Sequence, residues 1–299
     1  MIIDTHSHLN FKAYKNDLDE VVKRTLAENI WLINVGSKYE TSKQAVEIAE
    51  KYGKGIFAAI GLHPIFSGAE FVKIKTDPGE GEFLAKEQNF EKEKYKELAK
   101  SRKVVAIGEI GLDYYYRPKT KAKLEHFKAR QKKVFTDQLD FARELGLPVI
   151  LHCRMAHNDL LDIFKNYQLQ TANYKLAGVV HCFTGTPEDA REYLNLDLYL
   201  GFNGIIFKMD LDEVIKICPP DKILVETDCP YLTPPQEEDP PKDSHLSGSA
   251  PNTRSAGIGR RNEPIFIKHI VQKIADLKGM SFDEVAEATA QNAKKLFRI

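Results

Sequence analysis

The sequence alternates short apolar segments with amphipathic helical segments from one end to the other. The apolar segments are continuous and rich in Val, Ile and Leu, which is typical of parallel strands buried on both faces. There are eight of them: Ile2–Asp4, Ile30–Val35, Ile56–Ile60, Val104–Gly108, Val149–Leu151, Ala177–Val180, Leu198–Gly201 and Ile223–Val225. Eight strand–helix alternations favour a closed (β/α)8 TIM barrel over an open doubly wound sheet. We therefore expect one α/β domain that spans residues 1–299.

Several helical segments carry end signals. Residues Thr120–Leu145 place apolar side chains on one face and stop at Gly146, a residue typical of helix C-termini. Thr186 is followed by proline and two acids, which predicts a capped helix start. The segment Ser281–Glu284 is a capping box that opens a final helix. Asn16–Asp17 can cap the first helix.

Two longer stretches, Ser67–Phe90 and Pro234–Arg261, interrupt this alternation. Both follow predicted strands, so both belong at the carboxyl-terminal rim of a barrel, where sites are built. The second stretch is rich in proline, glycine, serine and acids, and we expect a mobile rim loop rather than part of the core. The charged run Glu91–Glu97 is typical of a solvated helix with ion pairs four residues apart.

The composition limits the partners and the compartment. Lys plus Arg equals Asp plus Glu, 43 each, so no overall field attracts nucleic acid or an anionic membrane. The sequence shows no secretory h-region and no run of apolar residues long enough to span a membrane. The four cysteines have no CxxC spacing, which suits free thiols in a reducing compartment. We expect a cytoplasmic monomer without a membrane partner.

Residues that can bind metal or move protons are concentrated where the predicted strands end. They are His6 and His8 near the first strand, His63 after the third, Glu109 after the fourth, His152 after the fifth, His181 after the sixth, and Glu226 and Asp228 after the eighth. A barrel brings all of these strand ends onto one rim around a common centre. The sequence therefore predicts a metal site at this rim.

The residue types support this interpretation, although each has a simpler alternative. His6 and His8 are two residues apart on a strand, so their side chains share a face and can hold a divalent metal. The same pattern also fits two surface histidines. Glu109 could be a structural carboxylate, but a buried acid without a cation is costly. Glu226 and Asp228 should face inward together, where a metal or a base must separate their charges.

The sequence lacks the motifs of several other kinds of binding and catalytic site. No G-x-G-x-x-G segment opens a helix, no phosphate-binding P-loop occurs, and no serine or cysteine stands in a nucleophile elbow. His126 and His269 lie in the middle of predicted helices and are expected to be ordinary surface or packing residues. His157 and His245 have no ligand-type partner in the sequence, and we place them outside the site.

Seven motifs together resemble a known family. They are His6-Ser-His8, Gly61-Leu-His63-Pro64, Gly108-Glu109-Ile-Gly-Leu-Asp113, His152-Cys-Arg154, His181-Cys-Phe-Thr-Gly185, Glu226-Thr-Asp228-Cys-Pro-Tyr-Leu232 and Arg261-Asn-Glu-Pro264. In this order they resemble the TatD family of metal-dependent deoxyribonucleases, which are amidohydrolase-like TIM barrels. The sequence departs from the family at Asn10, where an aspartate is usual, and in its two long loops.

The resemblance implies a binuclear metal centre. One ion would be held by four residues, His6, His8, Glu109 and Asp228, and the second by Glu109, His152 and His181, so that Glu109 bridges the two ions. The resemblance also places His63, Arg154 and Glu226 near the scissile phosphate, with Asp228, Glu226 and His63 in catalytic roles.

The expected ligand set favours a phosphodiester substrate. Two dications against the carboxylates of Glu109 and Asp228 leave a local charge of about +2, which suits an anionic substrate better than a neutral amide. Asp228 would orient or deprotonate a water, and Arg154 could contact the phosphate. Mixed imidazole and carboxylate ligands allow Mg, Mn or Zn.

We therefore expect a phosphodiester hydrolase acting on DNA, and the resemblance implies a 3′–5′ exonuclease on single strands. With net charge zero, we expect weak DNA binding through the metals and a few rim cations such as Arg154 and Arg261, equivalent to about one to three phosphates. Tyr114–Tyr116 and Tyr231 could stack unpaired bases, or they could pack under the rim loops.

Two alternatives remain open at this point. One is an amide, lactone or ester hydrolase on the same barrel; such enzymes often bridge their metals with a carboxylated lysine where this chain has Glu109. The other is a non-catalytic scaffold, which a complete ligand set disfavours because unpaired buried acids and imidazoles destabilise a fold.

Overall fold

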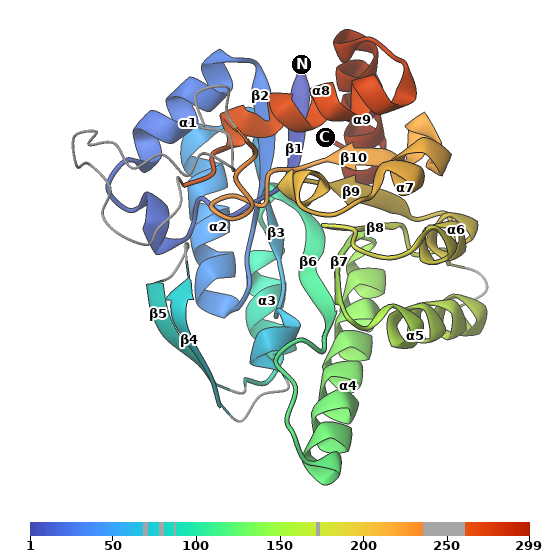
Figure 1. Cartoon of the computed structure of the whole chain (residues 1–299). Helices are drawn as coiled ribbons and strands as arrows, with labels where there is room; N and C mark the ends of the chain where they lie inside the picture. The colour runs from blue at the N-terminus through green and yellow to red at the C-terminus, as the bar shows by residue number, and fades with distance from the viewer. Residues whose placement is uncertain (68–70, 78–80, 87, 172–173, 236–260) are drawn as a thin grey trace, which may run out of the picture.

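The eight main strands form one parallel sheet that curves into a barrel (Figure 1). The computed structural model describes the chain apart from residues 68–70, 78–80, 87, 172–173 and 236–260. The strand order is β1-β2-β3-β6-β7-β8-β9-β10. Their bounds are β1 Ile2–Ser7, β2 Ile30–Val35, β3 Ile56–Ile60, β6 Val104–Asp113, β7 Val149–Arg154, β8 Gly178–Val180, β9 Tyr199–Phe202 and β10 Ile223–Val225. The predicted (β/α)8 architecture and all eight strand positions are confirmed.

The first strand and the segment after the last strand meet and complete the ring. The Asp228 amide donates to the carbonyl of His6 at 2.8 Å, and the His8 amide donates to the carbonyl of Cys229 at 2.9 Å. Below them, the Thr5 hydroxyl donates to the carbonyl of Val225 at 3.1 Å. Backbone pairing therefore fixes the two histidines beside Asp228.

Three strands run further into the site than their apolar segments indicate. β6 continues to Asp113 and pairs with β7 beyond a register shift between Ile107 and Ile110, so Glu109 lies within the strand. β1 likewise continues through His6 to Ser7, and β7 continues through His152 to Arg154. The polar residues end the apolar pattern without ending the backbone pairing, and all three strands carry ligand-type side chains into the barrel mouth.

The helices cover the outside of the barrel and bury their apolar faces against it. Their bounds are α1 Leu18–Ala27, α2 Tyr39–Tyr52, α3 Lys92–Leu98, α4 Lys121–Leu145, α5 His157–Gln170, α6 Pro187–Asn195, α7 Asp212–Ile217, α8 Ile267–Lys278 and α9 Phe282–Phe297. Short 3-10 turns lie at Lys12–Tyr14, Pro64–Phe66, Gly204–Phe207, Pro220–Lys222 and Pro264–Phe266.

The predicted helix ends are confirmed, with one exception. α4 ends at Gly146, whose φ of 66° is left-handed, and the capping boxes at Thr186 and Ser281 are formed. The prediction for the first helix was wrong in part. Asp17 occupies the N-cap position of α1, but its side chain makes no capping bond because its carboxylate accepts two bonds from Arg261.

The structure describes much of the first insertion and little of the second. Much of Ser67–Phe90 is a separate antiparallel hairpin of β4 (Phe71–Asp77) and β5 (Gly81–Lys86) (Figure 1). Residues 236–260 of Pro234–Arg261 lie outside the described part, so the expected mobile loop stays a prediction.

The charged helix α3 has its ion pairs in a different register from the one predicted. Lys94 pairs with Glu91 three residues away, and Lys96 pairs with Glu144 of α4. Among the described residues, no helix is long and apolar enough to cross a membrane.

Candidate metal centre

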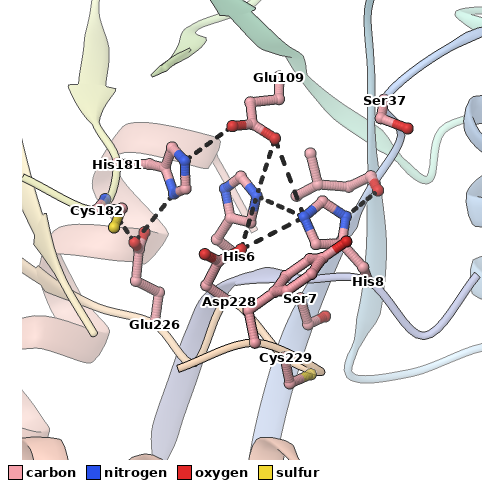
Figure 2. Close-up of polar contacts among 12 residues, drawn as sticks. His6, Ser7, His8, Ser37, Glu109, His181, Cys182, Glu226, Asp228 and Cys229 are labelled. Atoms are coloured by element: carbon pink, nitrogen blue, oxygen red, sulfur yellow. Dashed lines mark hydrogen bonds and ion pairs between the residues drawn. The ribbon is translucent and has the colours of Figure 1, made fainter. Parts of the chain in front are cut away.

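Imidazole and carboxylate side chains converge in one pocket at the carboxyl ends of the strands. The pocket has a volume of about 400 Å³, and five of the six predicted metal ligands line it, together with His63 and Arg154. The sixth, His6, lies fully buried beneath it on β1. Figure 2 shows His6, His8, Glu109, His181 and Asp228 pointing toward one another. The six side chains expected from the sequence are therefore brought together.

The first group of donors surrounds one oxygen of Glu109. His6 Nε2 lies 3.1 Å from His8 Nε2 and 3.5 Å from Glu109 Oε2. Asp228 Oδ1 lies 3.4 Å from His8 Nε2 and 3.8 Å from His6 Nε2. Two imidazole nitrogens and two carboxylates thus surround a space in which all four could bind the same ion.

The second group surrounds the other oxygen of the same carboxylate. Glu109 Oε1 lies 2.6 Å from His152 Nδ1 and 2.9 Å from His181 Nε2. Glu109 therefore presents one oxygen to each group, which is the arrangement a bridging ligand requires. Within each group the ligand atoms lie within 4.8 Å of one another. The first group is His6, His8 and Glu109, and the second is Glu109, His152 and His181.

Hydrogen bonds on the far side of two rings fix the tautomer that a metal needs. His8 Nδ1 lies 2.8 Å from the carbonyl of Val35, so Nδ1 carries the proton and donates it. His181 Nδ1 lies 3.1 Å from Glu226 Oε1 and donates in the same way. In both rings the Nε2 lone pair is left facing the pocket. Such outer partners orient histidine ligands and raise their basicity.

The electrostatics of the cluster also fit divalent ions. Burial opposes ionisation of Glu109, but His63, His181 and His6 hold the pKa of its carboxyl well below the usual range. Burial likewise acts against Asp228, and the bond to His8 is the main cause that lowers the pKa of Asp228. Ionised acids buried among imidazoles require positive charge, which protons or metal ions supply. The donor set, nitrogen and carboxylate oxygen, suits Zn or Mn and also allows Mg.

His63 presents a proton rather than a lone pair to the pocket. Its Nδ1 accepts the Ile65 amide at 3.0 Å, which places the ring proton on Nε2. That Nε2 lies 3.4 Å from Glu109 Oε1 and 3.2 Å from His152 Nδ1. The side chain is therefore a donor at the edge of the centre, as its expected position near a phosphate requires.

The structure places Glu226 differently from the expectation. Its side chain is fully buried and is not part of the described pocket lining. Glu226 Oε1 accepts bonds from the Cys182 amide at 2.7 Å, Asn203 Nδ2 at 3.1 Å and His181 Nδ1. The carboxylate lies behind His181, where it cannot contact a phosphate in the pocket and instead orients the imidazole.

The two predicted arginines also differ from each other. Arg154 is exposed, lines the pocket and stacks over Tyr115 with its guanidinium carbon 3.7 Å from the ring centroid. Arg261 is not in the described lining; its guanidinium binds Asp17 at 2.8 and 2.5 Å and Glu263 at 2.8 Å. Arg261 thus ties the end of the second insertion to the start of α1.

Sequence reasoning missed the role of Asp113. Its Oδ2 lies 3.3 Å from His152 Nε2, and its Oδ1 accepts the Tyr115 amide at 2.8 Å. Asp113 therefore holds the His152 ring from behind, with Nδ1 turned toward Glu109. The available signal was its spacing, because Asp113 follows Glu109 by four residues in a strand and so faces the same side.

A parallel barrel with imidazoles and carboxylates gathered at the carboxyl ends of its strands defines a metal-dependent hydrolase. Residues 3–298 match the model of the TatD related DNases. The chain belongs to this family, and the resemblance found in the motifs is confirmed.

Named relatives cover the whole chain. The "Uncharacterized metal-dependent hydrolase YabD" of Bacillus subtilis is 39% identical, with all of both chains aligned. The "3'-5' ssDNA/RNA exonuclease TatD" of Citrobacter rodentium is 33% identical over all of this chain and 98% of its own. Among solved structures, the TatD homologue YJJV of Escherichia coli is similar at a TM-score of 0.76 and 26% identity, covering 100% of this chain and 98% of its own.

Proposed function

We propose that this chain is a single-domain phosphodiester hydrolase that removes nucleotides from single-stranded DNA in the 3′–5′ direction, with two divalent metal ions. The observation that supports it most is Glu109, whose two oxygens face two separate groups of histidines. The Citrobacter rodentium relative, named as a 3′–5′ exonuclease on single-stranded DNA and RNA, supports the polarity and the substrate.

The two donor groups divide the proposed ligands between the ions. His6, His8, Glu109 and Asp228 would hold one ion, and Glu109, His152 and His181 the other. Paired metals bind phosphate oxygens, lower the pKa of a water and stabilise the leaving oxygen. Mg, Mn and Zn are all compatible with these ligands.

Asp228 is the proposed base. Its side chain is 14% exposed, enough to face the pocket, and its pKa is lowered, so the group is an ionised carboxylate that holds no proton of its own. One oxygen is directed at His8 Nε2 at 3.4 Å, which fixes the carboxylate while it orients the attacking water. The proton of that water goes to Asp228.

His63 and Arg154 would bind and balance the phosphate on the open side of the centre. His63 carries its proton on Nε2, where it can donate a hydrogen bond to the leaving oxygen. Arg154 presents a planar guanidinium, which matches two phosphate oxygens at once. Both side chains line the same pocket.

Two observations disfavour the alternatives. In β6 the chain has Glu109 where lactone and amide hydrolases of this type often use a lysine, and family membership joins the chain to DNases. The organophosphorus hydrolase of Deinococcus radiodurans is similar at a TM-score of 0.53 and only 13% identity, which shows a common fold and no more. A non-catalytic scaffold would have to retain six buried or half-buried ligand-type side chains at one point for no use.

The test is digestion of a single-stranded oligonucleotide labelled at either end, with Mg, Mn or Zn supplied in turn. A 5′-labelled strand should shorten stepwise, whereas a 3′-labelled strand should release its label in the first turnover. Duplex DNA, RNA and a panel of lactones and amides are run beside it. Lactone or amide turnover without nucleotide release would transfer the function to the alternative.

A cytoplasmic, monomeric enzyme completes the proposal. Its support is that Cys153, Cys182, Cys218 and Cys229 are all free thiols, three of them buried, as in proteins of reducing compartments. Light scattering during gel filtration measures the oligomeric state, and a dimer mass would overturn that part.

A further inference from the structure

A strongly basic segment follows the β6 strand that carries Glu109. Residues 117–133 contain eight lysines and arginines and a single acid, Glu125. The chain as a whole has no net charge, so its composition hides this concentration. We call this segment the basic ridge.

The ridge begins outside the packed body of the barrel. Residues 119–123, which include the first helical positions of α4, are exposed, and the buried residues of the helix begin only at Phe127. In Figure 1 the amino-terminal end of α4 projects beyond the barrel. Within the part of the chain that the structure describes, residues 119–123 cover no buried core, so core packing does not account for the length or the charge of this overhang.

Three cations of the ridge have no ion-pair partner among the described residues: Arg117, Lys119 and Lys121. Further along α4, by contrast, Lys132 pairs with Asp159 and Lys133 pairs with Asp137. A helix whose cations serve solubility commonly intersperses acids with them. The positive charge without an ion-pair partner is thus concentrated at the amino-terminal end of the ridge, which follows β6 and lies nearest to the metal pocket in the sequence.

Aromatic residues join the ridge to the metal pocket. Tyr116, the neighbour of Arg117, is 37% exposed and lines the pocket. Tyr115 is 51% exposed, lies edge-on to Tyr116 at 4.8 Å and supports the Arg154 guanidinium. Tyr114 differs, since it is 4% exposed and donates to Asp159, so it packs under the rim and is not available for stacking.

We propose that the basic ridge, with Tyr115 and Tyr116 at its base, binds the backbone of the single strand beyond the nucleotide being cleaved. The inference rests on the proposed function and adds the path of the strand to it. Basic grooves combined with exposed aromatic rings are the usual means of binding single strands without sequence preference. The occupant is a single-stranded polynucleotide because only its charge matches the ridge and only its bases are free to stack.

The ridge changes the expected salt dependence. Composition alone predicted binding equivalent to about one to three phosphates. Adding Arg117, Lys119 and Lys121 raises this to about four to six phosphates. Removing one cation that binds a phosphate should reduce the slope of log affinity against log salt by about 0.7.

The test compares two variants that lose the same charge. The first is Arg117→Gln/Lys119→Gln/Lys121→Gln; the control is Lys23→Gln/Lys216→Gln/Lys295→Gln, three exposed lysines of α1, α7 and α9. Binding of a long labelled oligonucleotide is measured in EDTA across a salt series. Turnover of a dinucleotide, too short to reach the ridge, is measured with metal.

The ridge variant should bind the long strand about tenfold or more weakly at low salt and show a slope smaller by about two. Its dinucleotide turnover should equal that of the parent, and the control variant should match the parent in both assays. Unchanged binding in the ridge variant, or an equal loss in the control, would overturn the inference. So would an effect confined to duplex DNA. If the parent hydrolyses neither substrate, the proposed function fails, and the binding series in EDTA still decides the ridge.

Discussion

Glu226 Oε1 lies 3.1 Å from His181 Nδ1, while the opposite nitrogen of the same ring lies 2.9 Å from Glu109 Oε1 (Figure 2). The imidazole is thus held between a fully buried carboxylate and the carboxylate that faces both donor groups. Glu226 acts on the centre through His181, as a positioning residue, and this relationship leads to the first prediction.

Glu226→Gln should weaken metal binding by about tenfold to a hundredfold without unfolding the protein. The amide oxygen can still accept from Cys182 and Asn203, but the loss of charge makes His181 a weaker ligand. Metal titration of the metal-free variant measures the affinity. Saturating metal should restore much of kcat, which a residue acting on the phosphate would not allow. Parent-like metal affinity with a large, metal-independent loss of kcat would instead place Glu226 among the reacting groups.

Glu109→Gln should abolish hydrolysis and leave fewer than two ions bound. The change removes the charge shared by both donor groups and keeps the shape of the side chain, so the barrel should fold as before. Elemental analysis, an activity assay and a thermal melt together check this. The matched control is Glu91→Gln, which removes the same charge from an exposed glutamate. Full activity of the Glu109 variant would contradict the bridging role.

His63→Gln should lower kcat by about a hundredfold or more while the bound metal stays unchanged. The reason is the tautomer: Nδ1 accepts from the Ile65 amide, so Nε2 offers a proton and no lone pair. Metal content per chain and the rate at saturating substrate are the two readouts. Loss of one ion from the variant would show that His63 is a ligand after all.

Arg261→Met should reduce the stability of the fold by about 1–2 kcal/mol and leave oligonucleotide affinity unchanged. The guanidinium binds Asp17 and Glu263 and does not reach the pocket lining. Denaturant unfolding and oligonucleotide binding are measured side by side. Arg154→Met is the comparison, because its loss should weaken substrate binding and spare stability. A marked fall in oligonucleotide affinity for Arg261→Met would return it to the substrate site.

The ion pair between Arg261 and Asp17 also predicts how the stability of the fold depends on pH. The hydrogen bond from Arg261 lowers the pKa of Asp17, so the pair stabilises the fold above the ordinary pKa of an aspartate. That contribution is lost as the pH falls through the lowered value. The difference in stability between the parent and Arg261→Met should therefore be largest near neutral pH and narrow on acidification below about 4. If the difference in stability between the parent and Arg261→Met stays constant at acidic pH, Arg261 stabilises the fold through packing and not through its charge.

The sequence predicted the barrel because eight buried parallel strands leave an unmistakable run of apolar residues at each position. It also predicted which strand ends meet, and so which ligand-type side chains gather. It failed at Glu226 for a geometric reason. β10 ends at Val225, and Asp228 has a φ of 52°, so the alternation of side chains along a strand does not extend to these residues.

The role of Arg261 was not predictable either, because its partner Asp17 is 244 residues away in the chain and no local pattern links the two. Among the tyrosines, burial alone separates Tyr114 from its two exposed neighbours. The sequence identifies aromatic residues at the rim, and only the packing of α4 and α5 determines which ones face solvent.

The central claim is that two metal ions, bridged by Glu109, are needed to hydrolyse a single-stranded DNA end. The most direct measurement counts ions per chain and nucleotides released in the same samples, as metal is added back to EDTA-treated protein. We predict no release without metal and a rate that rises as occupancy approaches two ions per chain. Full nucleotide release by the metal-free protein, or full activity with no ion bound beyond the first, would contradict the account.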